Sequence, residues 1–450
     1  MCKYLLENPL VNVSAEAKFL LLKFIQLFGM DEVVQKGVKE LASDIGLSDR
    51  LVSRSLEELL ARGHLVRQTL CEGRGRPKSE YSISTALFAK LHRKSSASAS
   101  AHGELLNSII TSPELGGRQD LSSTNRLLLA VLLQHADKFG VVRDLGLSEL
   151  SKLTGLNRER TKGHIHKLQS LRILRFWEAG LTGSTLFGAV KSVYFLNLNC
   201  SVLSVSRDST AAFVFFCGFD PSGFSDLDEA GLIGKATWRR RDGQFDWQFQ
   251  RFAEMPDAAK YASLATYFVQ IDGRSPRGFQ SQRLLQLKLD EYASFLLSRY
   301  WRVLPTEMSL MDPELLNVIG KDLRVSSPPT EDGALAPLAV FLYEVSLCIA
   351  RRYQCLFAGL RDFSFESLDL MILPAPKDRW GKYRGSRILL AVAKRGPVFS
   401  GCYVVTPDAL NTNAAEHFER EDEIADADRY QYGLLREMHC PKRYGVFLDK

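Results

Sequence analysis

The sequence lacks the features that mark membrane and secreted proteins. It contains no apolar run of the roughly 20 residues that a bilayer-spanning helix requires. Its first residues do not resemble a signal peptide. Its 8 cysteines form no CxxC pair, a pattern typical of reduced cysteines in the cytoplasm. We therefore expect a cytoplasmic protein that has no membrane partner.

Motifs for common catalytic and cofactor sites are also missing. The sequence contains no GxxxxGK(S/T), GxSxG or HExxH pattern, and no GxGxxG before a predicted helix. The nearest metal candidates are Cys402, His417, His439 and Cys440, but their spacing fits no zinc module. We predict neither an enzyme nor a bound cofactor or metal.

The composition that is present indicates several globular domains with uneven charge. The chain has 450 residues, of which 45% are hydrophobic and 24% charged, enough for two to four domains. Residues 1–94 hold 15 Lys+Arg and 11 Asp+Glu, residues 104–199 hold 12 and 8, and the remainder holds 31 and 33. The net positive charge therefore lies in the N-terminal part, which indicates a region that binds a polyanion.

An internal repeat is the strongest signal in the sequence. Residues 38–67 (VKELASDIGLSDRLVSRSLEELLARGHLVR) align without a gap with residues 147–176 (LSELSKLTGLNRERTKGHIHKLQSLRILRF). Matching positions include Leu41 and Leu150, Gly46 and Gly155, Leu56 and Ile165, and Leu59 and Leu168. A further apolar helix precedes each stretch, starting near Ser14 and Ser122. The unit of three helices is too long for a solenoid repeat, so we predict a duplicated small domain.

Each copy has the pattern of a short helix, a tight turn and a second helix. Gly46 is suited to the left-handed conformation that ends a helix. Ser48 in the first copy and Asn157 in the second are predicted N-caps of the helix that follows. The first copy buries a stripe at i, i+4 and i+7, formed by Val52, Leu56 and Leu59. This arrangement is a helix-turn-helix.

After the helix-turn-helix, both copies change to a strand-like pattern with a predicted hairpin. The tip of the first hairpin is basic and glycine-rich (EGRGRPK, residues 72–78), whereas the tip of the second is nearly uncharged (LTGSTLFG, residues 181–188). The stretches LASDIGLSDRLVSRSLEELLARGHLVR and GRGRPKSEYSIS resemble the winged-helix domain of bacterial transcription regulators, in particular the MarR-like and PadR-like families. The resemblance covers about residues 14–85, with a weaker match over 122–198.

This resemblance implies two tandem winged helix-turn-helix domains that bind double-stranded DNA. In such domains the helix after the turn enters the major groove, where arginine side chains can read guanine. The residues expected to contact DNA are Ser48, Arg50, Ser53 and Arg54 in the first copy, Arg74, Arg76 and Lys78 in its wing, and Asn157, Arg158, Arg160, Lys162 and His166 in the second copy. For the second copy, a structural role in protein contact stays open as an alternative.

The expected fold class is α+β, in four segments. They are a winged-helix domain over 1–94, a flexible linker over 95–118 that contains SSASASAHG, a second winged-helix domain over 119–199, and an α+β domain over 200–450 with a candidate boundary near 326–336. In the last segment we predict helices over Ala258–Phe268, Gln280–Trp301 and Leu335–Ala358, and strands over Leu370–Leu373, Ile388–Val392 and Gly401–Val405.

Three functions are compatible with this organisation. The leading hypothesis is a sequence-specific transcription regulator, a homodimer whose C-terminal domain serves assembly or senses a small-molecule effector. The second is a replication initiator of a plasmid or mobile element, because such proteins also resemble tandem winged helices. The third is an enzyme or defence effector that the N-terminal half targets to DNA, with an unrecognised site in residues 200–450.

Overall fold

A computed structural model shows the chain as two compact units. It describes residues 3–70, 78–93, 100–112, 121–184, 186–203, 210–216, 229–234, 264, 267, 268, 271, 275–307, 310–323, 335–374, 386–395, 400–405 and 415–435. The first unit is Met1–Trp177 with Ser192–Arg207, and the second is Glu178–Lys191 with Asp208–Lys450. Both units contain helices and strands, so the predicted α+β class is confirmed.

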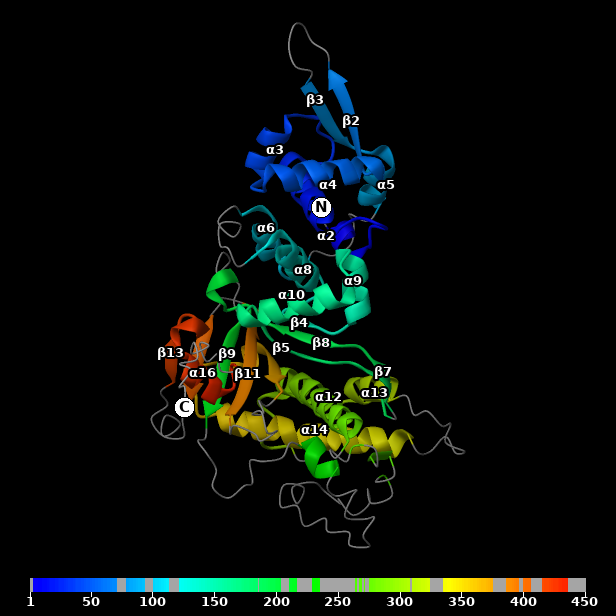
Figure 1. Cartoon of the computed structure of the whole chain (residues 1–450). Helices are drawn as coiled ribbons and strands as arrows, with labels where there is room; N and C mark the ends of the chain where they lie inside the picture. The colour runs from blue at the N-terminus through cyan, green and yellow to red at the C-terminus, as the bar shows by residue number, and fades with distance from the viewer. Residues whose placement is uncertain are drawn as a thin grey trace, which may run out of the picture. The chain divides into compact units, whose positions relative to one another are not determined.

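The first unit contains the same series of elements twice (Figure 1). The first copy consists of α2 (Ala15–Phe28), β1 (Val34–Gln35), α3 (Val38–Ile45), α4 (Asp49–Ala61), β2 (Leu65–Leu70) and β3 (Lys78–Ile83). The second copy consists of α8 (Ser123–Gln134), β4 (Val141–Val142), α9 (Leu147–Thr154), α10 (Arg158–Ser170), β5 (Leu174–Glu178) and β8 (Val193–Leu196). Their three-stranded sheets have equivalent orders, β1-β3-β2 and β4-β8-β5. The repeat in the sequence is therefore a repeat in the structure.

Local sequence signals explain why the two copies fold alike. The carboxylate of Glu40 accepts a hydrogen bond from the Gly37 amide at the start of α3, and Glu149 does the same for Gly146 at the start of α9. Each of these helices ends at a glycine in the left-handed conformation, Gly46 or Gly155. The predicted caps also stand where expected, since Ser48 precedes α4 and Asn157 precedes α10.

A single hydrophobic core joins the two copies. Helices α2 and α8 contact each other, and both contribute many of its buried side chains. The core is continuous from Leu5 in α1 (Lys3–Glu7) to Leu203, and it includes the Val52 and Ile165 side chains of the two copies. This core is larger than either copy could form alone, and a larger core stabilises the folded unit more.

The predicted linker between the copies contains a helix, which corrects the expectation of a flexible segment over 95–118. Residues Gly103–Thr111 form α6, which contacts both α2 and α8. Its Leu105, Ile109 and Ile110 side chains are buried. The low-complexity composition before residue 103 hid this apolar stripe, whose spacing is that of a short amphipathic helix. A second short helix, α5 (Thr85–Arg93), follows the first hairpin.

The second unit is built on a five-stranded sheet of order β10-β11-β9-β12-β13. Its strands are β9 (Ala211–Phe216), β10 (Leu368–Leu373), β11 (Ser386–Ala393), β12 (Gly401–Val405) and β13 (Glu416–Phe418). Strands β9 and β12 are parallel, and the other neighbouring strands of this sheet are antiparallel. Phe213 on β9 stacks on Tyr403 of β12 with ring centroids 4.9 Å apart. Aromatic side chains therefore fill the core beneath the sheet.

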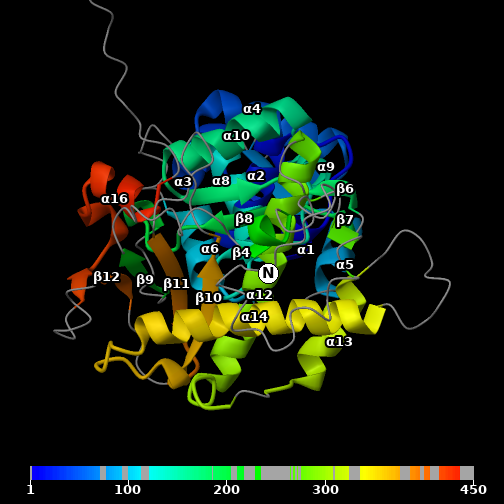
Figure 2. The same cartoon turned by 90° about the horizontal axis from the view of Figure 1, so that it is seen from below.

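Two long helices pack in this core, as the sequence predicts (Figure 2). Helix α12 (Pro276–Tyr300) contacts β10 and α14 (Leu335–Phe357), and α14 also contacts α13 (Pro313–Asp322). The predicted helices over 280–301 and 335–358 and the three predicted strands are thus confirmed. The helix expected over Ala258–Phe268 falls almost entirely outside the described residues. A last short helix, α16 (Asp426–Tyr432), lies near β9.

Candidate nucleic-acid interface

Helix α4 presents a polar face whose positive charges are not neutralised. Its buried stripe is the predicted one, formed by Val52, Leu56 and Leu59. On the opposite side Arg50 and Arg54 are exposed one helical turn apart, Ser53 is half-buried, and Ser48 is exposed at the cap. Within the described part of the chain, neither arginine has a carboxylate partner. Both guanidinium groups are therefore available to an external ligand.

Helix α10 has the same position in the second copy, but two of its exposed cations are paired with carboxylates. Asn157, Arg158, Arg160, Lys162 and His166 are all exposed. Two of these cations pair with carboxylates of the protein itself. Arg160 lies 3.1 Å from Glu16 of α2, and Lys162 lies 3.0 Å from Glu159. Among the predicted contact cations, α10 therefore has only Arg158 without a described carboxylate partner, whereas α4 has both Arg50 and Arg54.

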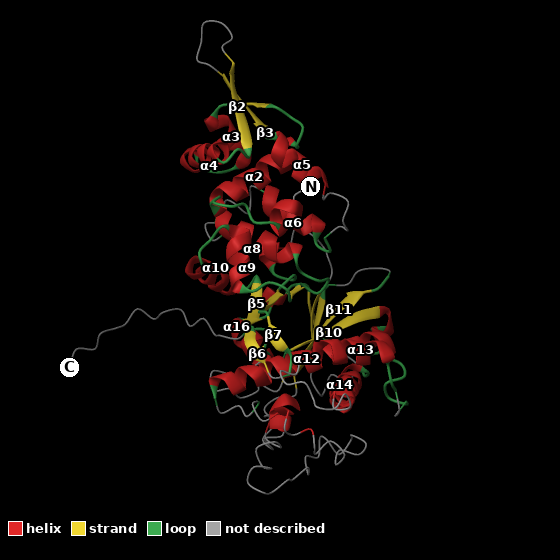
Figure 3. Cartoon of the chain, turned by 90° about the vertical axis from the view of Figure 1, so that its right-hand side faces the viewer, coloured by secondary structure: helices red, strands yellow, loops and turns green. Residues whose placement is uncertain are grey.

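The two helices lie on the same side of the first unit. Figure 3 shows α4 and α10 one above the other along one edge, and Figure 2 shows them near the same edge when seen from below. In Figure 1 both helices run across the view rather than along it. An extended ligand that contacts one of these helices could therefore contact the other.

The first hairpin has the expected strands. Strands β2 and β3 pair in antiparallel register from Leu65 opposite Ile83 to Leu70 opposite Lys78. Lys78 is thus the first residue of β3. Arg74 and Arg76 of the predicted wing tip lie outside the described residues.

The predicted second hairpin is divided between the two units. Its strands are β5 and β8, which are neighbours in the sheet of the second copy, whereas its tip forms a separate small hairpin in the second unit. The strands of this small hairpin are β6 (Leu181–Ser184) and β7 (Gly188–Val190), and β6 contacts α12. From α12, Arg277 donates a hydrogen bond to the Gly183 carbonyl at 2.9 Å, and Arg283 lies 2.6 Å from the nearly buried carboxylate of Glu178. These bonds hold the hairpin tip within the protein, which favours a structural role for the tip.

Three buried cations in the first unit were not among the predicted functional residues. Lys18 and Lys23 of α2 and Arg126 of α8 are each only 1% exposed. Burial lowers the pKa of Lys18 to about 7 and that of Lys23 to about 8, and for Lys23 the nearby positive charge of Arg126 lowers the pKa further. The signal in the sequence was a lysine inside the apolar run FLLLKFIQLF, an unusual position for a residue that almost always stays exposed.

Each buried cation donates to the carboxyl-terminal end of a neighbouring helix. Lys23 donates to the Ile45 carbonyl at the end of α3, and Lys18 donates to the Leu153 carbonyl near the end of α9. Arg126 donates to the carbonyls of Ile109, Ile110 and Ser112 at the end of α6. The partial negative charge of a helix end and the unpaired carbonyls there compensate a buried cation without a carboxylate.

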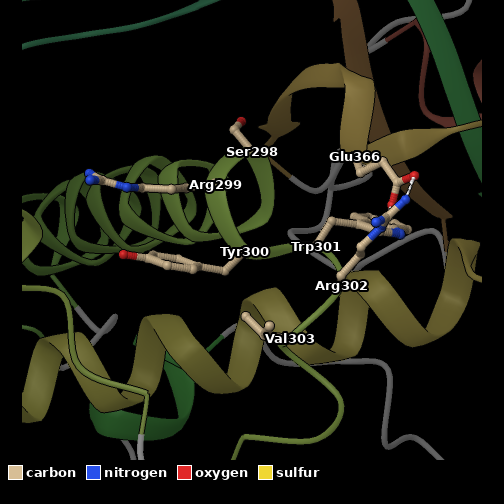
Figure 4. Close-up of a pocket in the computed structure, with 7 residues that line it drawn as sticks. All are labelled: Ser298, Arg299, Tyr300, Trp301, Arg302, Val303 and Glu366. Atoms are coloured by element: carbon tan, nitrogen blue, oxygen red, sulfur yellow. Dashed lines mark hydrogen bonds and ion pairs between the residues drawn. The ribbon is translucent and has the colours of Figure 1, made fainter.

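A shallow pocket in the second unit is lined by positively and negatively charged side chains (Figure 4). Its volume is about 180 Å³, and residues 298–303 at the end of α12 and Glu366 form its walls. Arg302 pairs with Glu366, and Arg299 lies 2.5 Å from Glu314. Ligand pockets usually enclose about 300–1,000 Å³, so this one is small, and carboxylates of the protein already neutralise its arginines.

The described residues hold no group of three His, Cys, Asp or Glu side chains placed to bind a metal. Cys402 lies on β12 and His417 on β13, whereas His439 and Cys440 lie outside the described residues. Among the described helices, none combines the length and apolar character needed to cross a bilayer. No known protein family, curated protein or solved structure matches this chain.

Proposed function

We propose that the chain is a sequence-specific double-stranded DNA-binding protein that regulates transcription, and that the two copies in its first unit are winged-helix domains. The support for the fold is the order of elements: in both copies a glycine turn joins two helices, and a three-stranded sheet contains one short strand from before these helices and two strands from after them. Such a domain inserts the helix after the turn, here α4 or α10, into the major groove.

The observation that carries the proposal is the free arginine pair of α4. Arg50 and Arg54 are exposed, share one face, and have no carboxylate partner among the described residues. A guanidinium fork can donate two hydrogen bonds to O6 and N7 of guanine. A carboxylate-paired arginine would first have to give up its partner.

The position of α10 supports contact by both copies with one duplex. Helix α10 lies on the same side of the first unit as α4, and its Arg158 is exposed without a described partner. The paired Arg160 and Lys162 are partly neutralised and contribute less to attraction toward phosphates. We therefore assign the stronger base reading to the first copy, and to the second copy a weaker half-site on the same duplex.

The test begins with selection of bound fragments from random duplex DNA by the full-length protein. Arg50→Ala and Arg54→Ala should each weaken binding to the selected sequence by roughly 1–3 kcal/mol, and weaken binding to scrambled DNA less. The matched control is Arg361→Ala, which removes the same charge from an exposed position in the second unit. Equal losses on both duplexes would make the two arginines phosphate contacts, and the absence of DNA binding by the wild-type protein would refute the proposal.

Footprinting of the selected sites on genomic DNA separates a regulator from a replication initiator. Single operators at promoters would support regulation, whereas an array of direct repeats at an origin would support the initiator alternative. The assembly or sensing role of the second unit remains a prediction.

A further inference from the structure

The two copies meet at the beginning of α2. We call residues 13–23, which contain the cap and first turns of this helix, the junction segment. Its first contact is with α4 of its own copy: the hydroxyl of Ser14 donates to the Glu58 carboxylate at 2.6 Å, and the Ser14 amide donates to the same carboxylate. This charge-assisted pair of hydrogen bonds attaches the segment to α4.

The same segment contacts the turn that precedes α10. A Cβ atom at Gly155 would lie 2.4 Å from the Val13 carbonyl oxygen, so the turn between α9 and α10 packs directly on the backbone of the segment. Glu16 pairs with Arg160 of α10 at 3.1 Å and also accepts a hydrogen bond from Thr124 of α8. One stretch of chain thus contacts both α4 and α10.

Two buried lysines continue this connection. Lys23 donates to the last turn of α3, directly before α4, and Lys18 donates to the last turn of α9, directly before α10. Both lysines come from α2 and both are nearly inaccessible to solvent. Moving α10 relative to α4 would therefore leave a buried ammonium group or a helix-end carbonyl without its partner, which is strongly unfavourable.

We propose that the junction segment holds α4 and α10 at one fixed separation, so that a single chain recognises two half-sites of a duplex at a single spacing. The proposal rests on the DNA-binding function proposed above. Lys18, Glu16 and Gly155 are in this view positioning residues, since they act through the helices that contact DNA rather than by touching it.

The probe is a set of duplexes that carry both selected half-sites with zero to ten inserted base pairs. Two linked binding modules that engage together gain about 10²–10⁴-fold over either alone. An insertion of about half a helical turn places the second half-site on the opposite side of the duplex, so wild-type affinity should fall by at least about 100-fold. Similar affinity at every spacing would overturn the inference and leave the proposed function intact.

Gly155→Ala and Gly46→Ala form a matched pair of variants. Both glycines end the helix before a helix that we propose contacts DNA, with φ of +73° and +67°. A substitution at either one therefore meets the same conformational penalty. Only at Gly155 would the new Cβ collide with the backbone of the junction segment, at 2.4 Å from the Val13 carbonyl oxygen, whereas a Cβ at Gly46 would only touch the end of the Lys23 side chain at 3.9 Å. Gly155→Ala should broaden or shift the preferred spacing, whereas Gly46→Ala should keep it.

Glu16→Gln provides a variant with less risk to folding. It removes the ion pair with Arg160 but keeps the size of the side chain. Glu104→Gln removes the same charge from an exposed site on α6 and serves as its control. Glu16→Gln should reduce the penalty for a half-turn insertion by about tenfold, at an unchanged melting temperature of the first unit. A spacing preference unchanged in both Glu16→Gln and Gly155→Ala would overturn the inference, and failure of the wild-type chain to bind any duplex would overturn the proposed function as well.

Discussion

Helices α4 and α10 occupy equivalent positions in the two copies, yet they differ in how many of their exposed cations are paired with carboxylates. The arginines of α4 face solvent without a described partner, whereas two cations of α10 pair with Glu16 and Glu159. The hairpins differ in the same sense, since the first carries the Gly-Arg tip and the second is bonded to α12. Equivalent positions in the two copies thus differ in charge pairing, because part of the charged surface of the second copy makes contacts within the chain.

The largest expected effect tests whether the two copies fold as one cooperative unit. Val52 and Ile165 belong to one continuous core, so damage in one copy should reach the other. Val52→Asp buries an unpaired charge and should lower the free energy of unfolding of the first unit by at least about 4 kcal/mol. Hydrogen exchange should accelerate in α10 as well as in α4. Arg50→Asp, an exposed substitution on the same helix, is the control, and exchange confined to α4 in Val52→Asp would show that the copies fold independently.

The next effect concerns the two hairpins. Replacing Arg74, Arg76 and Lys78 by Ala should weaken binding to all duplexes about 100-fold at physiological salt, if each contacts a phosphate. The slope of log K against log salt should then fall by about 0.9 for each phosphate that the variant no longer neutralises. Lys191→Ala, close to the second hairpin, is the comparison and should leave the slope unchanged. An unaltered slope in the triple variant would remove the first wing from the interface.

A pH effect of intermediate size should come from Lys18. An unfolded lysine keeps its proton up to a pH of about 10.4, whereas burial lowers the pKa of folded Lys18 to about 7. Between these values the unfolded state binds more protons, so the stability of the first unit should rise with pH, and Lys18 alone should contribute about 1 kcal/mol per unit from pH 7 to 9. Urea unfolding at pH 7, 8 and 9 measures this slope.

Lys18→Met is the control for this pH dependence. Methionine keeps much of the apolar stem and cannot take up a proton, so the variant should lose most of the rise between pH 7 and 9. Lys23, with its pKa of about 8, should supply the smaller remainder. A slope in Lys18→Met as steep as in the wild-type protein would assign the pH dependence to other groups.

The comparison also separates what the sequence could predict from what it could not. Gly46, Gly155 and Asn157 act on their own helix ends, so their roles follow from a few neighbouring residues, and the position of Ser48 before α4 was predicted in the same way. The pair between Glu16 and Arg160 joins residues 144 positions apart. Nothing local marks such a pair, and the apparent equivalence of α4 and α10 in the alignment hid the difference in their charge.

The second unit shows the same limit at a larger scale. Its two long helices and the strands β10, β11 and β12 were visible because apolar periodicity is a local property, whereas β9 and β13 were not predicted. The packing of the β6–β7 hairpin on α12 could not be predicted from local sequence. It depends on bonds from Arg277 and Arg283 to residues about 100 positions earlier in the chain. The prediction of a flexible linker over 95–118 was wrong for a related reason. Helix α6 in this segment is stabilised by packing on α2 and α8 rather than by its own composition.

The smallest expected effect distinguishes the two predicted caps. Asn157 accepts a hydrogen bond from the Arg160 amide at 2.8 Å, whereas the Ser48 side chain accepts no such bond at the start of α4. Asn157→Ala should therefore cost about 1 kcal/mol of stability and Ser48→Ala less than about 0.5 kcal/mol, although both residues are exposed at equivalent positions. Chemical unfolding of both variants at one pH measures the difference. Because Ser48 is free of a capping role, any loss of DNA binding in Ser48→Ala at unchanged stability would come from its hydroxyl at the interface. Equal destabilisation by the two substitutions would instead mean that Ser48 caps α4 in solution, and the two helix starts would then be equivalent after all.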